Sequence, residues 1–269
     1  MVTAAERGRV GFTSELGLVV RADGDTLTGT APAAPELCVP EEETPGAAST
    51  DRGVVLRPSV LLTWADILSG SLANEHTRPQ VCMTVDLTVR VAAPIPAGAE
   101  VHAVGRLLKV GRTITFAETV FTVGDDPVTA AIALSTFVAS PRPQDVAVSF
   151  VRGDDPVPGR YPTGPPEPVT QMLGTRVLES GVVEVPRHPR ILNWADTVQG
   201  GAVAACAEEA VLALDGAPVP HELEVRFTGA VRRGPMRATA RMVGPWVRID
   251  VADVGCDGRL IAVAAARGA

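Results

Sequence analysis

The stretch Gln199-Gly200-Gly201-Ala202-Val203-Ala204-Ala205-Cys206-Ala207-Glu208-Glu209-Ala210-Val211-Leu212-Ala213-Leu214 decides the fold of this chain. It contains no proline, it is rich in good helix formers, and Gly216 follows it as a stop signal. Apolar side chains recur along one face, and the small residues leave the expected helix almost apolar all round. We therefore predict a helix that other elements enclose on most sides.

Four strand-like segments follow this helix and are separated by short turn signals. Each is a short run in which apolar and polar side chains alternate or apolar residues dominate. Consecutive strands that are joined by short turns pair antiparallel. We expect one antiparallel sheet formed by residues 222–231, 236–243, 246–254 and 259–266.

The first half of the chain repeats this order of elements. A shorter and more polar helix is expected over residues 67–76, followed by strands over 81–91, 100–110, 113–123 and 127–139. Eight prolines lie between Pro141 and Pro168, where little periodic apolar pattern remains, so this stretch is expected to be a linker. The predicted organisation is an N-terminal unit (1–140), a Pro-rich linker (141–168) and a C-terminal unit (169–269).

Short sequence matches indicate that the two units arose by duplication. The segment from Thr63 to Gly70 matches the segment from Asn193 to Gly200 at an offset of 130 residues, with Trp-Ala-Asp shared. Upstream, Leu16-Gly17 matches Leu173-Gly174 at an offset of 157 residues. The difference predicts an insertion of about 27 residues in the first unit, at about 33–51, which a surface loop tolerates at low cost.

Composition excludes several classes of protein. The net charge is −7 and the longest basic cluster is Arg232-Arg233, so the chain lacks the basic surface that nucleic-acid binding requires. No apolar run is long enough to span a membrane, and the N-terminus lacks a secretory signal pattern, so the cytoplasm is the expected compartment. The scattered cysteines and histidines show no metal-binding spacing, and no metal or resident cofactor is expected.

The second unit resembles the PaaI-like acyl-CoA thioesterases, which have the hotdog fold. The motif of that family is an Asn or Gln, a His-Gly-Gly six residues later, and an acid eight residues after the first glycine. Asn193, Gln199-Gly200-Gly201 and Glu208 keep this spacing, with Gln199 in place of the usual His. The resemblance implies an α+β double hotdog fold, in which two curled antiparallel sheets each wrap a central helix and pack as a pseudo-dimer.

The chemistry of the motif follows from the helix N-terminus. Unpaired N–H groups and a partial positive charge at Gly200 and Gly201 would polarise a thioester carbonyl. Glu208 would act as general base or nucleophile, and Asn193 would orient the water or the carbonyl. Purely structural roles remain open for each: close packing for the glycines, a solvated surface pair for Glu208 with Glu209, and a helix cap for Asn193.

The first unit departs from the motif. Thr63 stands where the second unit has Asn193, Gly70 matches Gly200, Ser71 replaces Gly201, and Arg78 falls where an acid is expected. In dimeric members of the family the amide and the acid come from opposite units, so Gly70 would face Glu208 and Gly200 would face Arg78. We therefore predict one competent and one degenerate site per chain.

The predicted function is hydrolysis of a fatty or aryl acyl-CoA. Catalysis would use Glu208, Asn193 and Gly200, and the substrate would contact Gln199, Gly201, Gly70 and Thr63. The candidates to hold the phosphates of coenzyme A are Arg112, in a tight turn, and Arg232, Arg233 or Arg248 near strand ends, because guanidinium groups bind phosphate bidentately. Each could instead be a solvated charge that blunts the sheet edge. A non-catalytic acyl-CoA or lipid-binding protein and an enoyl-CoA hydratase of the same fold are the alternatives, and a homo-oligomer is possible.

Overall fold

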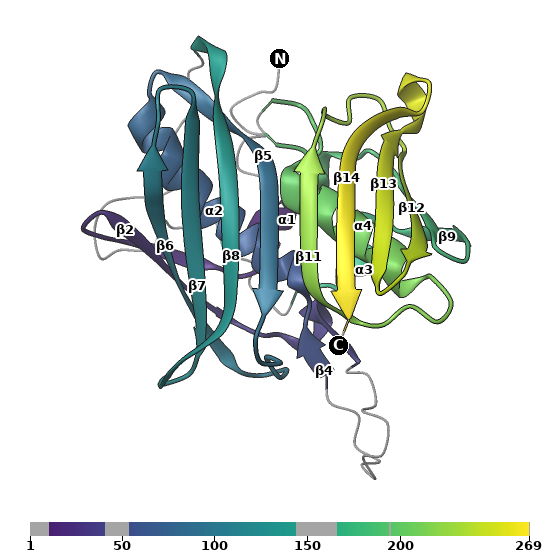
Figure 1. Cartoon of the computed structure of the whole chain (residues 1–269), viewed down its shortest axis with the longest axis horizontal. Coiled ribbons are helices and arrows are strands. Elements are labelled where there is room, and N and C mark those ends of the chain that lie inside the picture. Colours follow the sequence, from purple (N-terminus) through teal and green to yellow (C-terminus); the bar gives the residue numbers. More distant parts are fainter. Residues whose placement is uncertain (1–10, 41–53, 144–165, 194, 269) are drawn as a thin grey trace.

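The computed structural model describes residues 11–40, 54–143, 166–193 and 195–268. Twelve strands in these ranges form one antiparallel sheet that runs through both halves of the chain (Figure 1). In spatial order the strands are β1 (Val19–Asp23), β2 (Thr26–Pro32), β6 (Glu100–Val110), β7 (Ile114–Val123), β8 (Asp126–Pro143), β5 (Gln80–Val91), β11 (Pro220–Phe227), β14 (Arg259–Gly268), β13 (Trp246–Asp253), β12 (Met236–Val243), β10 (Val182–Val185) and β9 (Arg176–Glu179).

The two halves meet where β5 pairs with β11. Arg90 lies opposite Glu222 at one end of this pairing, and Asp86 lies opposite Arg226 at the other. Most buried apolar residues of both halves form one continuous core, and Ala73, Ala117 and Phe137 form a small separate cluster. The sheet therefore does not stop at the boundary between the halves.

Two long helices lie against the same face of the sheet, one behind each half (Figure 1). They are α2 (Pro58–Thr77) and α4 (Gly200–Leu212), and they contact each other. In α4 all residues from Gly201 to Val211 are buried, which confirms the prediction of an enclosed helix. Two short helices, α1 (Phe12–Glu15) and α3 (Val169–Leu173), each precede a hairpin, β1–β2 and β9–β10.

All eight predicted strand segments coincide with strands. Strand β8 continues to Pro143, past the expected end at 139 and into the first residues of the predicted linker. Strand β11 ends at Phe227, four residues before the expected end. The rest of the linker, residues 144–165, lies outside the described residues.

The predicted start of the first helix is wrong. Helix α2 begins at Pro58, so Gly70 lies in its interior and Arg78 is its C-cap. Proline is favoured at the first helical position because its fixed φ suits the helix and its missing N–H is not needed there. Since α4 begins at Gly200, the helix starts are 142 positions apart, and the Trp-Ala-Asp match at an offset of 130 does not align equivalent positions.

The predicted surface insertion is partly inside the fold. Its first residues form η2 (Pro35–Leu37) and β3 (Cys38–Pro40), which pairs with β4 (Val54–Leu56) immediately before α2. Ala33 and Leu37 are fully buried, so this part of the segment supports the start of α2. Residues 41–51 lie outside the described residues. No helix in the described part of the chain is long and apolar enough to cross a membrane.

Candidate functional site

Each long helix begins opposite an acidic residue of the other helix. Asp66 follows the first residue of α2 by eight positions, and Glu208 follows the first residue of α4 by eight positions. Asp66 faces the start of α4 at Gly200, while Glu208 faces the start of α2 at Ser59. The expected crossing of amide and acid between the two halves is present, but Asp66 and Ser59 take the places predicted for Arg78 and Gly70.

The first of these places, the Asp66 site, has room for one added carbon atom beside Gly200. Oδ2 of Asp66 lies 3.6 Å from the position that a Cβ on Gly200 would occupy, and Cζ of Phe227 lies 3.4 Å from it. Both Asp66 and Gly200 are only partly buried. A carboxylate, a helix N-terminus and an aromatic ring thus surround the space beside Gly200.

A β-bulge aims Thr84 at Asp66. Thr84 pairs with Phe137 and Asp86 pairs with Thr136, so Val85 is an extra residue in β5. The bulge turns Thr84 toward the helices although Asp86, two positions later, points to the outer face. The Thr84 hydroxyl donates a hydrogen bond of 2.7 Å to Oδ1 of Asp66, which fixes the carboxylate and leaves Oδ2 directed at Gly200.

Burial raises the pKa of Asp66 from its usual value of 3.8 to about 6, and the hydrogen bond from Thr84 opposes part of this rise. A carboxyl group with a pKa near 6 is ionised at neutral pH and is also a strong enough base to accept a proton there. Asp66 therefore has the properties of a general base.

The start of α4 presents donors at this place. Gln199 is the N-cap, and its Oε1 accepts a hydrogen bond of 3.0 Å from the Gly201 N–H. The Gly200 N–H has no partner inside the helix, and no acceptor for it occurs among the described residues. Nε2 of Gln199 is buried and also lacks a partner within the described ranges. A carbonyl oxygen would satisfy such donors.

The second place, the Glu208 site, is filled by protein groups. Oε1 of Glu208 accepts from the Ser59 N–H at 3.1 Å, and Oε2 accepts from the Ser59 hydroxyl at 2.6 Å and from Nε of Arg57 at 2.5 Å. Arg57 also donates to Glu209 at 2.5 Å, and the Thr170 hydroxyl donates to the same carboxylate. Glu208 is 1% exposed and Arg57 is 3% exposed.

Arg57 explains why the two places differ. It is the N-cap of α2, as Gln199 is the N-cap of α4. The Arg57 side chain reaches the acid of the opposite helix, whereas the Gln199 side chain folds back onto its own first turn. Both oxygens of Glu208 are consequently engaged by protein donors, while Oδ2 of Asp66 is directed at Gly200.

Gly201 and Thr63 meet where the two helices pack closely together. A Cβ on Gly201 would lie 2.2 Å from Oγ1 and 2.6 Å from Cγ2 of Thr63, so only glycine allows this approach. Thr63 is fully buried and donates to the Ser59 carbonyl at 2.8 Å. For both residues the structure provides a packing role, and their contact with substrate stays a prediction.

Asn193 shapes the loop that leads into α4. Its Oδ1 accepts from the Ala195 N–H, the Thr197 N–H and the Thr197 hydroxyl at 2.9 to 3.2 Å. The side chain therefore organises an Asx-type turn rather than capping the helix directly. Its catalytic role also stays a prediction.

Gly70 lies within α2, where a Cβ would meet the Phe137 ring at 3.4 Å, so it is not at a helix start. Arg112 is exposed in the turn between β6 and β7. Arg248 points to the outer face of β13, where it pairs with Asp250 at 2.9 Å. Arg248 thus lies on the face of the sheet opposite α4 and the Asp66 site.

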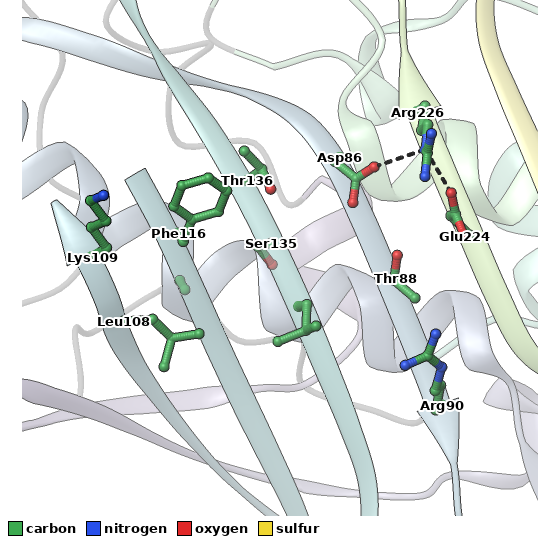
Figure 2. A pocket seen from close by; sticks show the side chains of 12 residues that line it. Asp86, Thr88, Arg90, Leu108, Lys109, Phe116, Ser135, Thr136, Glu224 and Arg226 are labelled. Carbon is green, nitrogen blue, oxygen red and sulfur yellow. Dashed lines mark ion pairs between the residues drawn. The ribbon is translucent and has the colours of Figure 1, made fainter. Parts of the chain in front are cut away.

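The outer face of the sheet also carries an open groove of about 560 Å³ across β5 to β8 and β11. Figure 2 shows Arg226 between Asp86 and Glu224, with ion-pair distances of 3.3 and 2.6 Å. Leu108 and Phe116 line the other side of the groove. The sheet separates this groove from the Asp66 site, so it is not part of that site.

Sequence reasoning missed Asp66 and Thr84. Asp66 is an acidic residue of the first half, but it lies eight residues after the helix start only because α2 begins at Pro58. A search for an acid eight residues after a proline helix start would have found it. Thr84 could not be assigned from alternation, because the bulge at Val85 reverses the direction of its side chain.

Comparisons with known proteins relate part of the chain to thioesterases. Residues 58–130 match the family model described as Thioesterase superfamily, and this segment begins at the first residue of α2 and contains Asp66 and Thr84. A search of curated protein sequences found no significant match.

Solved structures share the fold over nearly the whole chain. A candidate thioesterase of Novosphingobium aromaticivorans aligns with a TM-score of 0.59 at 16% identity, covering 92% of this chain and 96% of that one. An acyl-ACP thioesterase of Bacteroides thetaiotaomicron aligns at 0.57 and 12% identity, covering 90% and 97%. The 12:0-ACP thioesterase of Umbellularia californica aligns at 0.57 and 10% identity, covering 91% and 98%. At these identities the likeness shows the fold alone. The predicted resemblance to hotdog-fold thioesterases is confirmed, and its PaaI-like subtype stays a prediction.

Proposed function

We propose that the protein hydrolyses acyl thioesters at the Asp66 site. The main support is the Asp66 carboxylate, whose pKa is raised and whose Oδ2 lies 3.6 Å from the place of a Cβ on Gly200, a residue whose N–H has no partner among the described residues. The thioester carbonyl oxygen would accept from the Gly200 N–H at the positive end of α4. Nε2 of Gln199 is a candidate second donor to the same oxygen.

The reaction follows from these two groups. Asp66 takes a proton from water as the water oxygen bonds to the carbonyl carbon, and the negative charge develops on the oxygen held at Gly200. Collapse of this intermediate breaks the C–S bond, and the departing thiolate takes the proton back from Asp66. The products are a carboxylic acid and a thiol. Direct attack by Asp66 with an anhydride intermediate would use the same geometry.

The assignment of the base differs from the sequence prediction. Glu208 keeps the motif spacing, but Arg57 and Ser59 engage its carboxylate. Asp66 has one oxygen held by Thr84 and one directed at the helix start. These contacts favour Asp66 as the reacting group and Glu208 as a structural one. The Asp66 site would then be the competent site, and the Glu208 site the degenerate one.

We interpret the continuous sheet with its two helices as two hotdog units paired in one chain. Acyl-CoA is the substrate class that the sequence predicts, whereas two of the structural relatives are described as acyl-ACP thioesterases. Both carriers present the acyl group on the same thiol arm. A cytoplasmic location and a possible homo-oligomer remain expectations from the sequence.

The test compares Asp66→Asn with Glu208→Gln in a free-thiol assay over a panel of acyl-CoAs of different chain length. We expect Asp66→Asn to lose at least about 10²-fold in kcat and to remain folded by circular dichroism. Glu208→Gln should lower the melting temperature and keep most of the turnover. Loss of turnover in Glu208→Gln alone would return the catalytic role to Glu208. Acyl-CoA binding by the wild type without turnover would show a non-catalytic protein instead.

A further inference from the structure

An open pocket of about 450 Å³ lies at the end of the sheet in the second half. Three arginines, Arg176, Arg187 and Arg233, line it together with Glu184 and Gly234. It is formed where the chain leaves β10 and where it enters β12. We call it the Arg187–Arg233 pocket.

The charge of this pocket is positive although the chain as a whole is acidic. Its one carboxylate, Glu184, is already held by Arg176 and by the neighbouring Arg237, each at 2.6 Å. Arg233 is exposed and has no ion pair among the described residues. The Arg233 guanidinium therefore remains to attract an anion, beside Arg187, which pairs with Asp196 but keeps one unpaired donor.

Arg187 is held in place but is incompletely satisfied. Its NH2 group donates to the Asp196 carbonyl at 2.7 Å and pairs with the exposed Asp196 carboxylate at 2.9 Å. Its Nε is buried and has no acceptor in the described part of the chain. An unpaired buried donor is costly, so an acceptor that arrives with a ligand would be favourable here.

The loop that carries Arg233 is fixed before any ligand binds. The backbone N–H groups of Arg232, Arg233 and Gly234 donate to the buried Asp253 carboxylate at 2.7 to 3.1 Å. Gly234 has a φ of +68°, and a Cβ there would lie 2.7 Å from Cβ of Arg187. Only glycine allows the loop to approach Arg187 so closely, which brings the two arginines to one pocket.

The pocket is at the same end of the sheet as the Asp66 site. Phe227 lies beside Gly200 and pairs with Ala262 in β14. Ala262 pairs with Val251 in β13, and Val251 pairs with Ala238 in β12, so these residues form one row across the sheet. β12 and β10 are three and four strand spacings from β11, roughly 14 to 19 Å at about 4.8 Å per strand. Residues 228–235 lead directly from Phe227 to the pocket.

We propose that the Arg187–Arg233 pocket binds a phosphate group on the thiol carrier of the acyl substrate. This inference rests on the proposed function, because thioester carriers of this kind join the reacting sulfur to phosphate through a long pantetheine arm. The arm would lie along residues 228–235 with the sulfur at Gly200. The phosphate can belong to the nucleotide end of coenzyme A or to the phosphodiester of an acyl carrier protein, and the experiment separates these sources.

The first experiment measures binding and needs no hydrolysis. Adenosine 3′,5′-bisphosphate and coenzyme A are titrated by calorimetry into the wild type, Arg233→Gln and Arg241→Gln. Arg241 is the control, because it is exposed near the opposite end of β12 from Met236. The substitution at Arg233 keeps the backbone N–H that donates to Asp253. We expect Arg233→Gln to weaken binding of both probes by about tenfold or more, since charge-assisted hydrogen bonds are lost, and Arg241→Gln to bind as the wild type does.

The kinetic arm compares substrates with and without phosphate. Arg233→Gln should raise the KM for an acyl-CoA at least about tenfold relative to its KM for the matching acyl-N-acetylcysteamine thioester, which carries no phosphate. A raised KM for an acyl-ACP, together with unchanged binding of adenosine 3′,5′-bisphosphate, would identify the carrier protein as the phosphate source. Equal effects on all three substrates, or bisphosphate binding that Arg233→Gln leaves unchanged together with unchanged KM values, would overturn the proposal. If no thioester is hydrolysed, the proposed function fails while the calorimetric arm still decides on the pocket.

Discussion

The carboxylate of Asp66 on α2 faces Gly200, the first residue of α4, with Oδ2 3.6 Å from the place of a Cβ on residue 200. A carboxylate that is partly withdrawn from water pays a desolvation cost, and this cost raises the pKa of Asp66 to about 6. The same feature that suits Asp66 for catalysis therefore lowers the stability of the folded protein at neutral pH. Activity and stability should depend on pH in opposite directions around this value.

The rate should report the ionisation of Asp66. The base must be deprotonated, so kcat/KM for an acyl thioester should rise with pH and level off above about pH 6. A stopped thiol assay between pH 4.5 and 8 measures this profile. A rate that does not change across this range would be inconsistent with Asp66 as the base.

Asp66→Asn should stabilise the protein above pH 6. In the wild type the folded pKa of Asp66 is raised above its usual 3.8, so its contribution to stability is greatest below that value and is lost as the pH rises through about 6. The uncharged amide has no such dependence, and its Oδ1 can still accept from Thr84. Chemical denaturation should show the variant more stable at pH 7.5, with the difference shrinking toward pH 4. Equal stabilities at pH 7.5 would contradict the burial of a charged Asp66.

Thr84 should act as a positioning residue for Asp66. Its hydrogen bond stabilises the carboxylate, so Thr84→Val should raise the pKa of Asp66 and move the kcat/KM profile to higher pH. Thr84→Ser keeps the hydroxyl and should restore the wild-type profile. A loss of activity at all pH values with no shift of the midpoint would indicate a structural role only.

The sequence predicts most of the fold because the strands keep regular alternation. The turns Gly111-Arg112 and Gly244-Pro245 separate strands whose bounds were nearly right, and the small-residue pattern of α4 predicted its burial. The start of α2 was missed because an incidental Trp-Ala-Asp match outweighed the proline at its true first position.

The sequence predicts the spacing found at both helix starts, but it names Glu208 and not Asp66 as the candidate acid. The spacing of eight residues from helix start to acid holds in both halves, and so does the crossing of acid and helix start. What the sequence could not reveal is which acid is engaged by protein donors. That depends on Arg57, which is 151 positions from Glu208 and meets it only in the folded chain.

The adjacent glycines at the start of α4 should separate catalysis from stability. A Cβ on Gly200 meets Phe227 at an ordinary 3.4 Å, and alanine is the better helix former, so Gly200→Ala should fold as well as the wild type. The methyl group would occupy the space beside Oδ2 of Asp66, so kcat/KM should fall about 10²-fold. Thermal melts and thiol release on the same preparation measure both quantities. A fully active Gly200→Ala would place the thioester elsewhere.

Gly201→Ala should mainly reduce stability. Its Cβ would overlap Thr63 at 2.2 Å, and overpacking of a core contact costs about 1 to 3 kcal/mol. Thr63→Ala removes the two closest atoms, so the double variant should be less destabilised than the sum of the single variants. A double-mutant cycle by urea denaturation checks this coupling. Additive effects would mean that the helices separate rather than clash.

Arg57 should be the largest single electrostatic contributor to stability among the ion pairs described. Removing it in Arg57→Met leaves the Glu208 and Glu209 carboxylates buried without a cation, which costs about 3 to 5 kcal/mol. The exposed pair of Arg90 with Glu222 is the matched control, and Arg90→Gln should cost less than about 1 kcal/mol. If the loss arises from the unpaired carboxylates, then Arg57→Met combined with Glu208→Gln and Glu209→Gln should recover much of it, because the neutral amides remove the buried charge. A triple variant as unstable as Arg57→Met alone would show that Arg57 acts through packing instead.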